Sequence, residues 1–236
     1  MISFFNEIDS TNAEWARRLA AGAPSVEGEW LVARRQTAGR GRLGRAWQDG
    51  AGNFMGSTLV RPGPGDPPPA SLALLTGLAV AEAVAGHVPP PLAPLLKWPN
   101  DVLVNGAKLA GVLLEAQGDA VIVGVGVNLA SAPLLEGRET VALADFAPPP
   151  ALDHFAGQMA AAFAAQLASW RAHGLAALVA RWQQAALPQG TPLGVTGADG
   201  QRIEGRFAGL AEDGAMRLRL ADGAIRAIHA GDVALL

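Results

Sequence analysis

The residues best suited to chemistry in this sequence are the arginines and glycines of a loop that reads Gln-Thr-Ala-Gly-Arg-Gly-Arg-Leu-Gly-Arg-Ala-Trp, from Gln36 to Trp47. Five positive charges and no acidic residue lie between Trp30 and Gln48, although the whole chain has a formal net charge of -3. Arginine presents a planar set of donors that matches phosphate and carboxylate groups. Glycine allows a ligand to approach the backbone closely. The segment, here called the Gly-Arg loop, is predicted to bind an anion.

Two other interpretations of the Gly-Arg loop are weaker. Gly/Arg runs also occur in disordered RNA-binding segments, but this one lies between the apolar segments 30–33 and 53–60. A merely solvated loop would leave the concentration of arginine on an acidic chain unexplained. Because no Gly-Lys-Ser/Thr follows the glycines, a Walker-type phosphate loop is disfavoured. We expect the loop to be mobile without ligand and to fold over a bound one.

A second charged pair, Asp101 and Lys108, lies on either side of Asn105-Gly106. Asn-Gly between apolar runs predicts a tight β-hairpin, on whose strands these two side chains could converge. Taken singly, each has a plainer explanation, as a turn carboxylate and a solvated strand lysine.

A third candidate is the apolar run 121–129, which is predicted to be a buried strand interrupted by Gly124 and Gly126. Glycine inside a strand often marks the close approach of a ligand or of another backbone. Asn128 at the end of this run has both a donor and an acceptor, as an adenine edge would require. A turn-forming asparagine is the alternative.

The elements that position these residues are expected to be strands at 2–8, 30–34 and 54–61, and helices at 10–21, 71–85 and 153–186, the last with a break near His173-Gly174. Thr11 and Glu14 have the spacing of a capping box. A helix that begins at Ser10 and Thr11 beside a cationic loop would offer hydroxyl and N–H groups to a ligand.

The composition changes near residue 190. Short alternating apolar runs separated by Asp-Gly turns follow, which predicts a small β-barrel of about five strands. We therefore predict two domains, residues 1–187 and 188–236.

The composition also limits the function classes. The chain has 236 residues, half of them hydrophobic, and no cysteine, which fits the reducing cytoplasm. Glu7 and Asp9 argue against a secretory signal. The apolar stretch 70–88 contains Glu82 and His87 and is predicted to be a buried helix, so we expect no membrane association. The slight acidity gives no support to nucleic-acid binding.

Four blocks in order closely resemble the biotin–protein ligase family, also called biotin–[acetyl-CoA-carboxylase] ligase. They are Ser10-Thr11-Asn12, the Gly-Arg loop, Lys97 to Gly111 (with Lys-Trp-Pro-Asn-Asp and Lys-Leu-Ala-Gly) and Gly124 to Asn128. The resemblance implies an α+β fold, in which a mixed-sheet catalytic domain of the biotin/lipoate ligase type with flanking helices precedes a small SH3-like β-barrel. Since only nine residues precede Ser10, we expect the shorter, monofunctional type without a DNA-binding domain.

The resemblance implies that biotin and MgATP give biotinyl-5′-AMP and pyrophosphate, and that a lysine of a biotin carboxyl carrier protein then takes the biotin. The implied catalytic residues are Lys108, Arg42 and Asp101, with Asp101 also the expected ligand of Mg²⁺, which ATP would largely hold. Biotin would be bound by Ser10, Thr11, Asn12, Gln36, Gly39, Arg40, Lys108, Gly111, Gly124 and Gly126. ATP and the adenylate would be bound by Arg40, Arg42, Trp47, Asn100, Asp101, Lys108 and Asn128, with Trp47 stacked on adenine.

Two rival functions remain. A lipoate–protein ligase or octanoyltransferase shares the implied catalytic fold, although the Gly-Arg loop together with Lys-Trp-Pro-Asn-Asp favours biotin. A nucleic-acid-binding module built on the Gly-Arg loop is the rival from another class. An exposed edge strand would be compatible with a homodimer.

Overall fold

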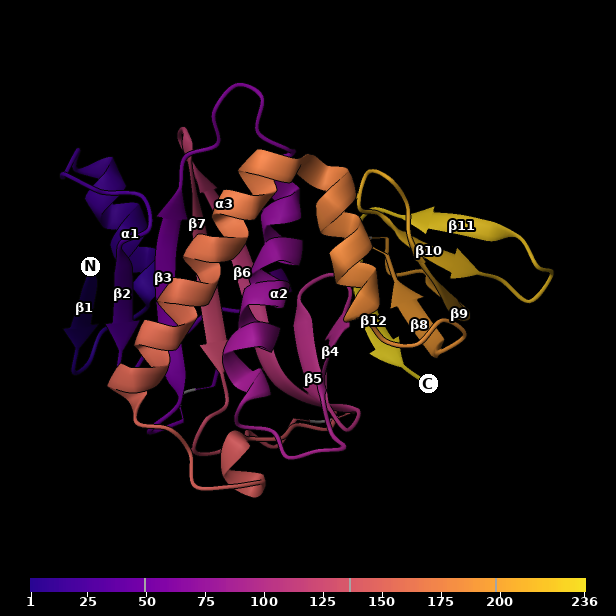
Figure 1. The fold of residues 1–236 in the computed structure, drawn as a ribbon, viewed down its shortest axis with the longest axis horizontal. Helices are drawn as coiled ribbons and strands as arrows, with labels where there is room; N and C mark the ends of the chain where they lie inside the picture. Colours follow the sequence, from indigo (N-terminus) through magenta and orange to yellow (C-terminus); the bar gives the residue numbers. More distant parts are fainter. Residues whose placement is uncertain (49, 136, 198) are drawn as a thin grey trace.

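A computed structural model of the chain describes residues 1–48, 50–135, 137–197 and 199–236 (Figure 1). The first part folds around a seven-stranded sheet, and the last part is a five-stranded antiparallel sheet. The strands of the first sheet are β1 Ile2–Phe5, β2 Trp30–Ala33, β3 Phe54–Val60, β4 Pro94–Lys97, β5 Asp101–Val104, β6 Ala107–Gln117 and β7 Ala120–Val127. The helices are α1 Thr11–Ala20, α2 Leu72–Ala85 and α3 Leu152–Gln184.

The order of strands in the first sheet is β1-β2-β3-β7-β6-β5-β4. The pair β1–β2 is parallel and the other pairs are antiparallel, so the predicted mixed sheet is confirmed. Helices α2 and α3 pack together in front of the sheet in Figure 1. Among the described helices, none has the combination of length and apolar character that crossing a membrane requires.

The two faces of the sheet are set by alternation along β7, since successive side chains of a strand point to opposite faces. Val121, Val123, Val125 and Val127 belong to the large core that includes α2 and α3. The even positions face the other way, where Ile122 packs with Trp15 of α1. Gly124 and Gly126 share this face, so the strand has a bare stretch beside α1.

The start of α1 differs from the predicted capping box. Ser10 is the N-cap, and its hydroxyl accepts a hydrogen bond from the backbone N–H of Ala13 at 3.4 Å. Thr11 already lies within the helix, and its hydroxyl contacts Ser57 of β3 instead. Glu14 forms ion pairs with Arg17 and Arg18. The spacing of Thr11 and Glu14 misplaced the cap by one residue.

The predicted hairpin is confirmed. Asn105 and Gly106 have φ values of 51° and 81°, as a two-residue turn of this kind requires. The strand β4 was not predicted, because the sequence before Lys97 is rich in proline. β4 lies at one edge of the sheet and is covered by the chain at Ala186, with which Leu96 forms a parallel bridge. β1 forms the other edge, and its use in a homodimer stays a prediction.

Helix α3 is interrupted at Gly174, whose φ of 73° and ψ of -173° are not helical, which confirms the predicted break. His154 and His173 lie exposed on this helix. The second sheet has the predicted five strands, in the order β11-β10-β9-β8-β12. They are β8 Pro192–Thr196, β9 Arg202–Leu210, β10 Met216–Arg219, β11 Ile225–Ile228 and β12 Asp232–Leu235. The division of the chain at 187/188 stays a prediction.

Candidate active site

A cavity of about 390 Å³ lies on the face of the first sheet that carries Gly124 and Gly126, a volume typical of small-molecule sites. The start of α1, the Gly-Arg loop, strands β5 to β7 and the start of β12 all contribute to its walls. The predicted site residues that line it are Ser10, Asn12, Gln36, Arg40, Arg42, Trp47, Asn100, Asp101, Lys108, Gly111, Gly124, Gly126 and Asn128. Thr11 and Gly39 stand behind this wall, so the structure brings nearly the whole predicted set to one place.

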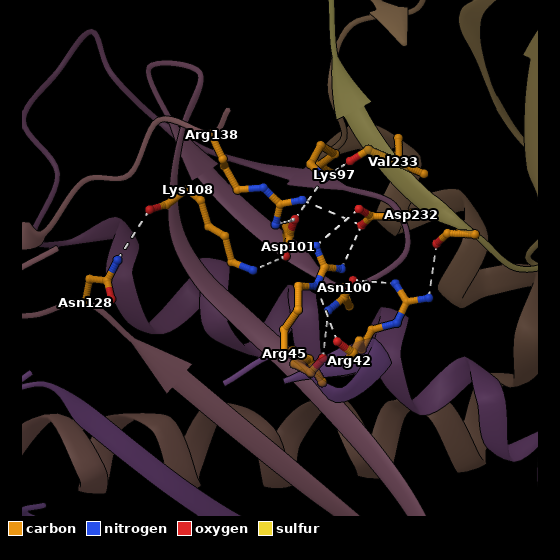
Figure 2. Close-up of polar contacts among 12 residues, drawn as sticks. Arg42, Arg45, Lys97, Asn100, Asp101, Lys108, Asn128, Arg138, Asp232 and Val233 are labelled. Carbon is orange, nitrogen blue, oxygen red and sulfur yellow. Dashed lines mark hydrogen bonds and ion pairs between the residues drawn. The ribbon is translucent and has the colours of Figure 1, made fainter. Parts of the chain in front are cut away.

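Asp101 is the centre of a buried cluster of cations, shown in Figure 2. Its carboxylate lies 2.6 Å from Nζ of Lys108 and 2.8 Å from Nζ of Lys97, and Nη1 of Arg138 is 3.5 Å away. The side chains of Asp101 and Lys97 are 5% and 6% exposed. The expected convergence of Asp101 and Lys108 is therefore confirmed, and Lys108 is no solvated strand charge.

The cluster has more positive than negative charge, and this decides the state of its carboxylate. Burial would raise the pKa of Asp101, but the charges of Lys97 and Lys108 outweigh it and hold this pKa below its usual range. Burial lowers the pKa of Lys97, although Asp101 opposes the shift. Three cations around one carboxylate make this end of the cavity attractive to anions.

The same contacts bear on the expected role of Asp101 as a ligand of Mg²⁺. Both carboxylate oxygens face ammonium groups. Within the described part of the chain, no three His, Asp or Glu side chains gather as a metal-binding group. As placed here, Asp101 does not fit a direct metal ligand, because a cation that coordinated it would have to replace a lysine.

The Gly-Arg loop is folded back on itself as a small hairpin. The N–H of Gly41 donates to the carbonyl of Arg45 at 2.7 Å, and the N–H of Trp47 donates to the carbonyl of Gly39 at 3.0 Å. Leu43 at the tip has a φ of 57° and is 72% exposed. The loop is thus in an ordered conformation beside the cavity, and its mobility without ligand stays a prediction.

Arg42 and Arg45 of the loop point in different directions (Figure 2). Arg42 donates to Oδ1 of Asn100 at 2.9 Å and to the carbonyl of Gly231 at 3.2 Å. Arg45 contacts Asp232 at 2.8 and 3.2 Å. The Gly-Arg loop is therefore anchored to the C-terminal sheet through Gly231 and Asp232.

The ring of Trp47 lies against the bare part of the sheet. A Cβ on Gly126 would overlap its ring, and one on Gly111 would meet the ring at 3.2 Å. Nζ of Lys108 is 5.7 Å from the ring centroid. The indole N–H is buried and has no acceptor among the described residues. Trp47 in this position covers Gly126, so a ligand on Gly126 would have to displace the ring.

A chain of hydrogen-bonded polar side chains begins at two residues that line the cavity, Gln36 and Asn12, and continues behind its wall. Oε1 of Gln36 accepts from the backbone N–H of Thr11 at 2.8 Å, and the hydroxyl of Thr11 lies 2.6 Å from that of Ser57. Ser57 donates to Oδ1 of Asn12, whose Nδ2 donates to Oε2 of Glu115 at 2.6 Å. The predicted set contained neither Ser57 nor Glu115.

Asn100 and Asn128, which were predicted to contact the nucleotide, form hydrogen bonds to the backbone around the cavity. Asn100 donates to the carbonyl of Val112 at 2.8 Å as well as accepting from Arg42. Nδ2 of Asn128 lies 3.1 Å from the carbonyl of Val141 and 3.4 Å from that of Lys108. Their amides therefore brace the walls, and a direct contact with nucleotide stays a prediction.

Sequence reasoning missed several residues of the charged end. Lys97 stood inside the Lys-Trp-Pro-Asn-Asp block without a role, yet its Nζ reaches Asp101 and donates to the carbonyl of Val233 at 2.7 Å. Arg138 and Asp232 had no local signal, because they come from a loop and from the second sheet. Only the folded chain brings them to Asp101 and Arg45.

Known proteins resemble this chain in sequence and in fold. Residues 7–128 match the biotin/lipoate A/B protein ligase family, and residues 194–236 match the biotin protein ligase C-terminal domain. The chain is 39% identical to the biotin–[acetyl-CoA-carboxylase] ligase of Paracoccus denitrificans, over 89% of this chain and 91% of the relative. It is 35% identical to the enzyme of the same name from Mycobacterium tuberculosis, over 95% and 85%. The structure of biotin protein ligase from Aquifex aeolicus in complex with biotin and ATP superimposes with a TM-score of 0.85 at 28% identity, covering 100% of this chain and 98% of that one.

Proposed function

Because the chain belongs to the biotin/lipoate A/B protein ligase family, we propose that it activates biotin with ATP to biotinyl-5′-AMP and transfers the biotin to a lysine of a carboxylase carrier protein. The observation that carries this proposal is that one cavity combines a positively charged region with a region of uncharged hydrogen-bonding groups. One end is a cluster of Lys97, Lys108 and Arg138 around Asp101, and the other is an uncharged chain of hydroxyl and amide groups from Gln36 to Asn12. Biotin matches these two regions, because it has a neutral ring system and a carboxylate at the end of its side chain.

The first step joins two anions that repel each other. A carboxylate oxygen of biotin attacks the α-phosphorus of ATP, the bond between the α-phosphorus and its bridging oxygen breaks, and pyrophosphate leaves. Lys108 neutralises the carboxylate and the α-phosphate together, while Arg42 and Arg40 hold the phosphates. The protein supplies charge and position, and no covalent bond to a side chain is needed. Mg²⁺ would enter with ATP as part of the substrate and would neutralise part of the phosphate charge.

Lys108 is the group best placed for this role. Its Nζ lies at the cavity wall, 2.6 Å from Asp101. Asp101 orients the ammonium group through this contact. The side chain of Lys108 is 14% exposed, against 6% for Lys97. Lys108 therefore faces the ligand, and Lys97 anchors Asp101 from behind.

The second step breaks the mixed anhydride. The neutral amine of the acceptor lysine attacks the biotinyl carbonyl, AMP leaves, and the amine proton passes to solvent. The cations that stabilised the first step also stabilise the negative charge that develops on the departing AMP. The Gly-Arg loop shields the anhydride from water until the acceptor arrives.

The relatives named as biotin ligases favour biotin over lipoate or octanoate as substrate. The experiment that tests the proposal is biotin-dependent exchange between ATP and labelled pyrophosphate, with lipoate and octanoate as control substrates. Labelled biotin should then pass to a carrier domain only when ATP is present. Exchange supported by lipoate but not by biotin would contradict the proposal. Lys108→Met should slow exchange by about 10²–10³-fold while the protein remains folded, because this is the contribution of one electrostatic contact to a reacting oxygen.

A further inference from the structure

Glu115 has no part in the function described so far, yet it joins two elements of the cavity. It lies on β6 on the same face as Gly111 and Leu113, by the alternation of the strand. Its Oε2 accepts from Nδ2 of Asn12 at 2.6 Å, and its Oε1 is 3.6 Å from Nη1 of Arg40 in the Gly-Arg loop. Its side chain is 34% exposed. One carboxylate therefore connects α1 and the loop to the sheet.

The contact with Asn12 fixes the direction of that amide. An ionised carboxylate only accepts hydrogen bonds, so it must face Nδ2 of Asn12 and leaves Oδ1 on the other side. Oδ1 then accepts the hydroxyl proton of Ser57. The amide also packs against the backbone of Gly124, where a Cβ would overlap Oδ1.

The direction continues along the chain of hydroxyl groups. Ser57 has one hydroxyl proton, and once it is given to Asn12 the oxygen of Ser57 can only accept. The hydroxyl of Thr11 lies 2.6 Å from the oxygen of Ser57 and 3.1 Å from Oε1 of Gln36, to which it can also donate. We assign its single proton to the shorter contact, the one to Ser57. Donation therefore runs from Thr11 to Ser57, to Asn12 and finally to Glu115. Chains of this kind reinforce each bond by polarisation.

We propose that Glu115 is a positioning residue that sets the hydrogen-bond direction of the uncharged end of the cavity, and so the recognition of the biotin ring, while holding Arg40 beside it. The proposal rests on the proposed function. A cyclic urea offers two N–H donors and one carbonyl acceptor in fixed places. A wall whose donors and acceptors have one fixed arrangement discriminates such a ring, whereas a wall with two equivalent arrangements binds it less tightly.

The test separates binding of biotin from binding of ATP in the exchange assay. Glu115→Met removes the acceptor, and Glu115→Gln offers a donor and an acceptor in place of the carboxylate. We expect the KM for biotin to rise roughly tenfold or more in Glu115→Met, as for the loss of one charged hydrogen bond. Glu115→Gln should fall between this variant and the wild type. The KM for ATP should rise less than the KM for biotin in both variants, because Glu115 lies 3.6 Å from the phosphate-binding Arg40 but 2.6 Å from Asn12. Asp119→Asn, an exposed carboxylate on the same hairpin, should leave both constants unchanged.

A second pair of variants keeps the proposal open to refutation if Glu115→Met does not fold. Asn12→Asp places two carboxylates against each other and should weaken biotin binding strongly. Adding Glu115→Gln restores a donor facing an acceptor, with the Ser57 hydroxyl still donating to residue 12, and should recover much of the lost affinity. An unchanged KM for biotin in folded Glu115→Met, or no recovery in the double variant, overturns the proposal. Absence of biotin-dependent exchange in the wild type would instead overturn the proposed function.

Discussion

Arg45 of the Gly-Arg loop is held by Asp232 at the start of β12, through contacts of 2.8 and 3.2 Å from its two terminal nitrogens. These residues are 187 positions apart in the chain. The side chain of Asp232 also lies 3.6 Å from Nη2 of Arg138, which reaches Asp101. The second sheet thus acts on both the loop and the cation cluster.

Asp232→Asn should loosen the Gly-Arg loop. The contact is partly exposed, so its loss should cost only roughly 0.2–1 kcal/mol, too little to unfold the protein. Backbone amides of residues 39–47 should exchange with deuterium faster in the free variant, and a bound adenylate should restore part of the protection. Glu212→Gln, in the exposed turn between β9 and β10 of the same sheet, is the control. Equal protection of the loop in both variants and the wild type would show that Asp232 does not hold it.

Arg42→Ala should shorten the retention of biotinyl-5′-AMP more than it weakens biotin binding. Arg42 contacts Asn100 and Gly231 at the charged end of the cavity, away from the Gln36–Asn12 chain. Losing one charged contact to the phosphate corresponds to about 10–100-fold faster release of the intermediate. A chase of preformed adenylate with unlabelled biotin measures it. Arg42→Lys, which keeps the charge but not the planar fork, should be intermediate, and an unchanged release rate in Arg42→Ala would remove Arg42 from the phosphate site.

Asp101→Asn should destabilise the protein, because it leaves the ammonium groups of Lys97 and Lys108 without their counter-charge. Breaking a buried pair in this way costs about 3–5 kcal/mol. The pKa of Asp101 is lower in the folded than in the unfolded state, so its ionisation stabilises the protein above the unfolded pKa of about 3.9. This contribution is lost as the pH falls through the folded pKa.

The pH dependence distinguishes this charge effect from a packing defect. The difference in free energy of unfolding between wild type and Asp101→Asn, measured with urea, should be largest near neutral pH and should shrink below about pH 4. A difference that stays constant with pH would mean that the substitution acts through packing alone.

Gly126→Ala should expel Trp47 from the sheet, because the added Cβ would overlap the indole ring. We expect a change in tryptophan emission and weaker retention of the adenylate, since the loop loses the contact at its end. Gly157→Ala is the control, because position 157 is in α3 with open space around it. Unchanged emission and retention in Gly126→Ala would show that the ring does not rest on this glycine.

Much of the site could be predicted because its residues come in short, distinctive blocks. The Asn105-Gly106 turn is a local signal, and it places Asp101 and Lys108 on paired strands without further information. The glycines of β7 likewise predict a surface without side chains, because glycine inside a strand often marks the close approach of a ligand or of another backbone. Local spacing was less reliable where two residues compete for one role, as Ser10 and Thr11 did for the helix cap.

The sequence by itself determined the alternation of strands and helices, the Gly-Arg loop, the break at Gly174 and the five-stranded C-terminal sheet, since each follows from backbone preferences and side-chain patterns within a few residues. Only the tertiary structure decided that Lys97 and Arg138 share Asp101 with Lys108, that Glu115 ends the hydroxyl chain from Thr11, and that Asp232 holds Arg45. These partners are distant in sequence or are ordinary charged residues without a local signal. Their charges act through space over a few ångströms in a buried site, so their roles exist only once the sheets have brought them together.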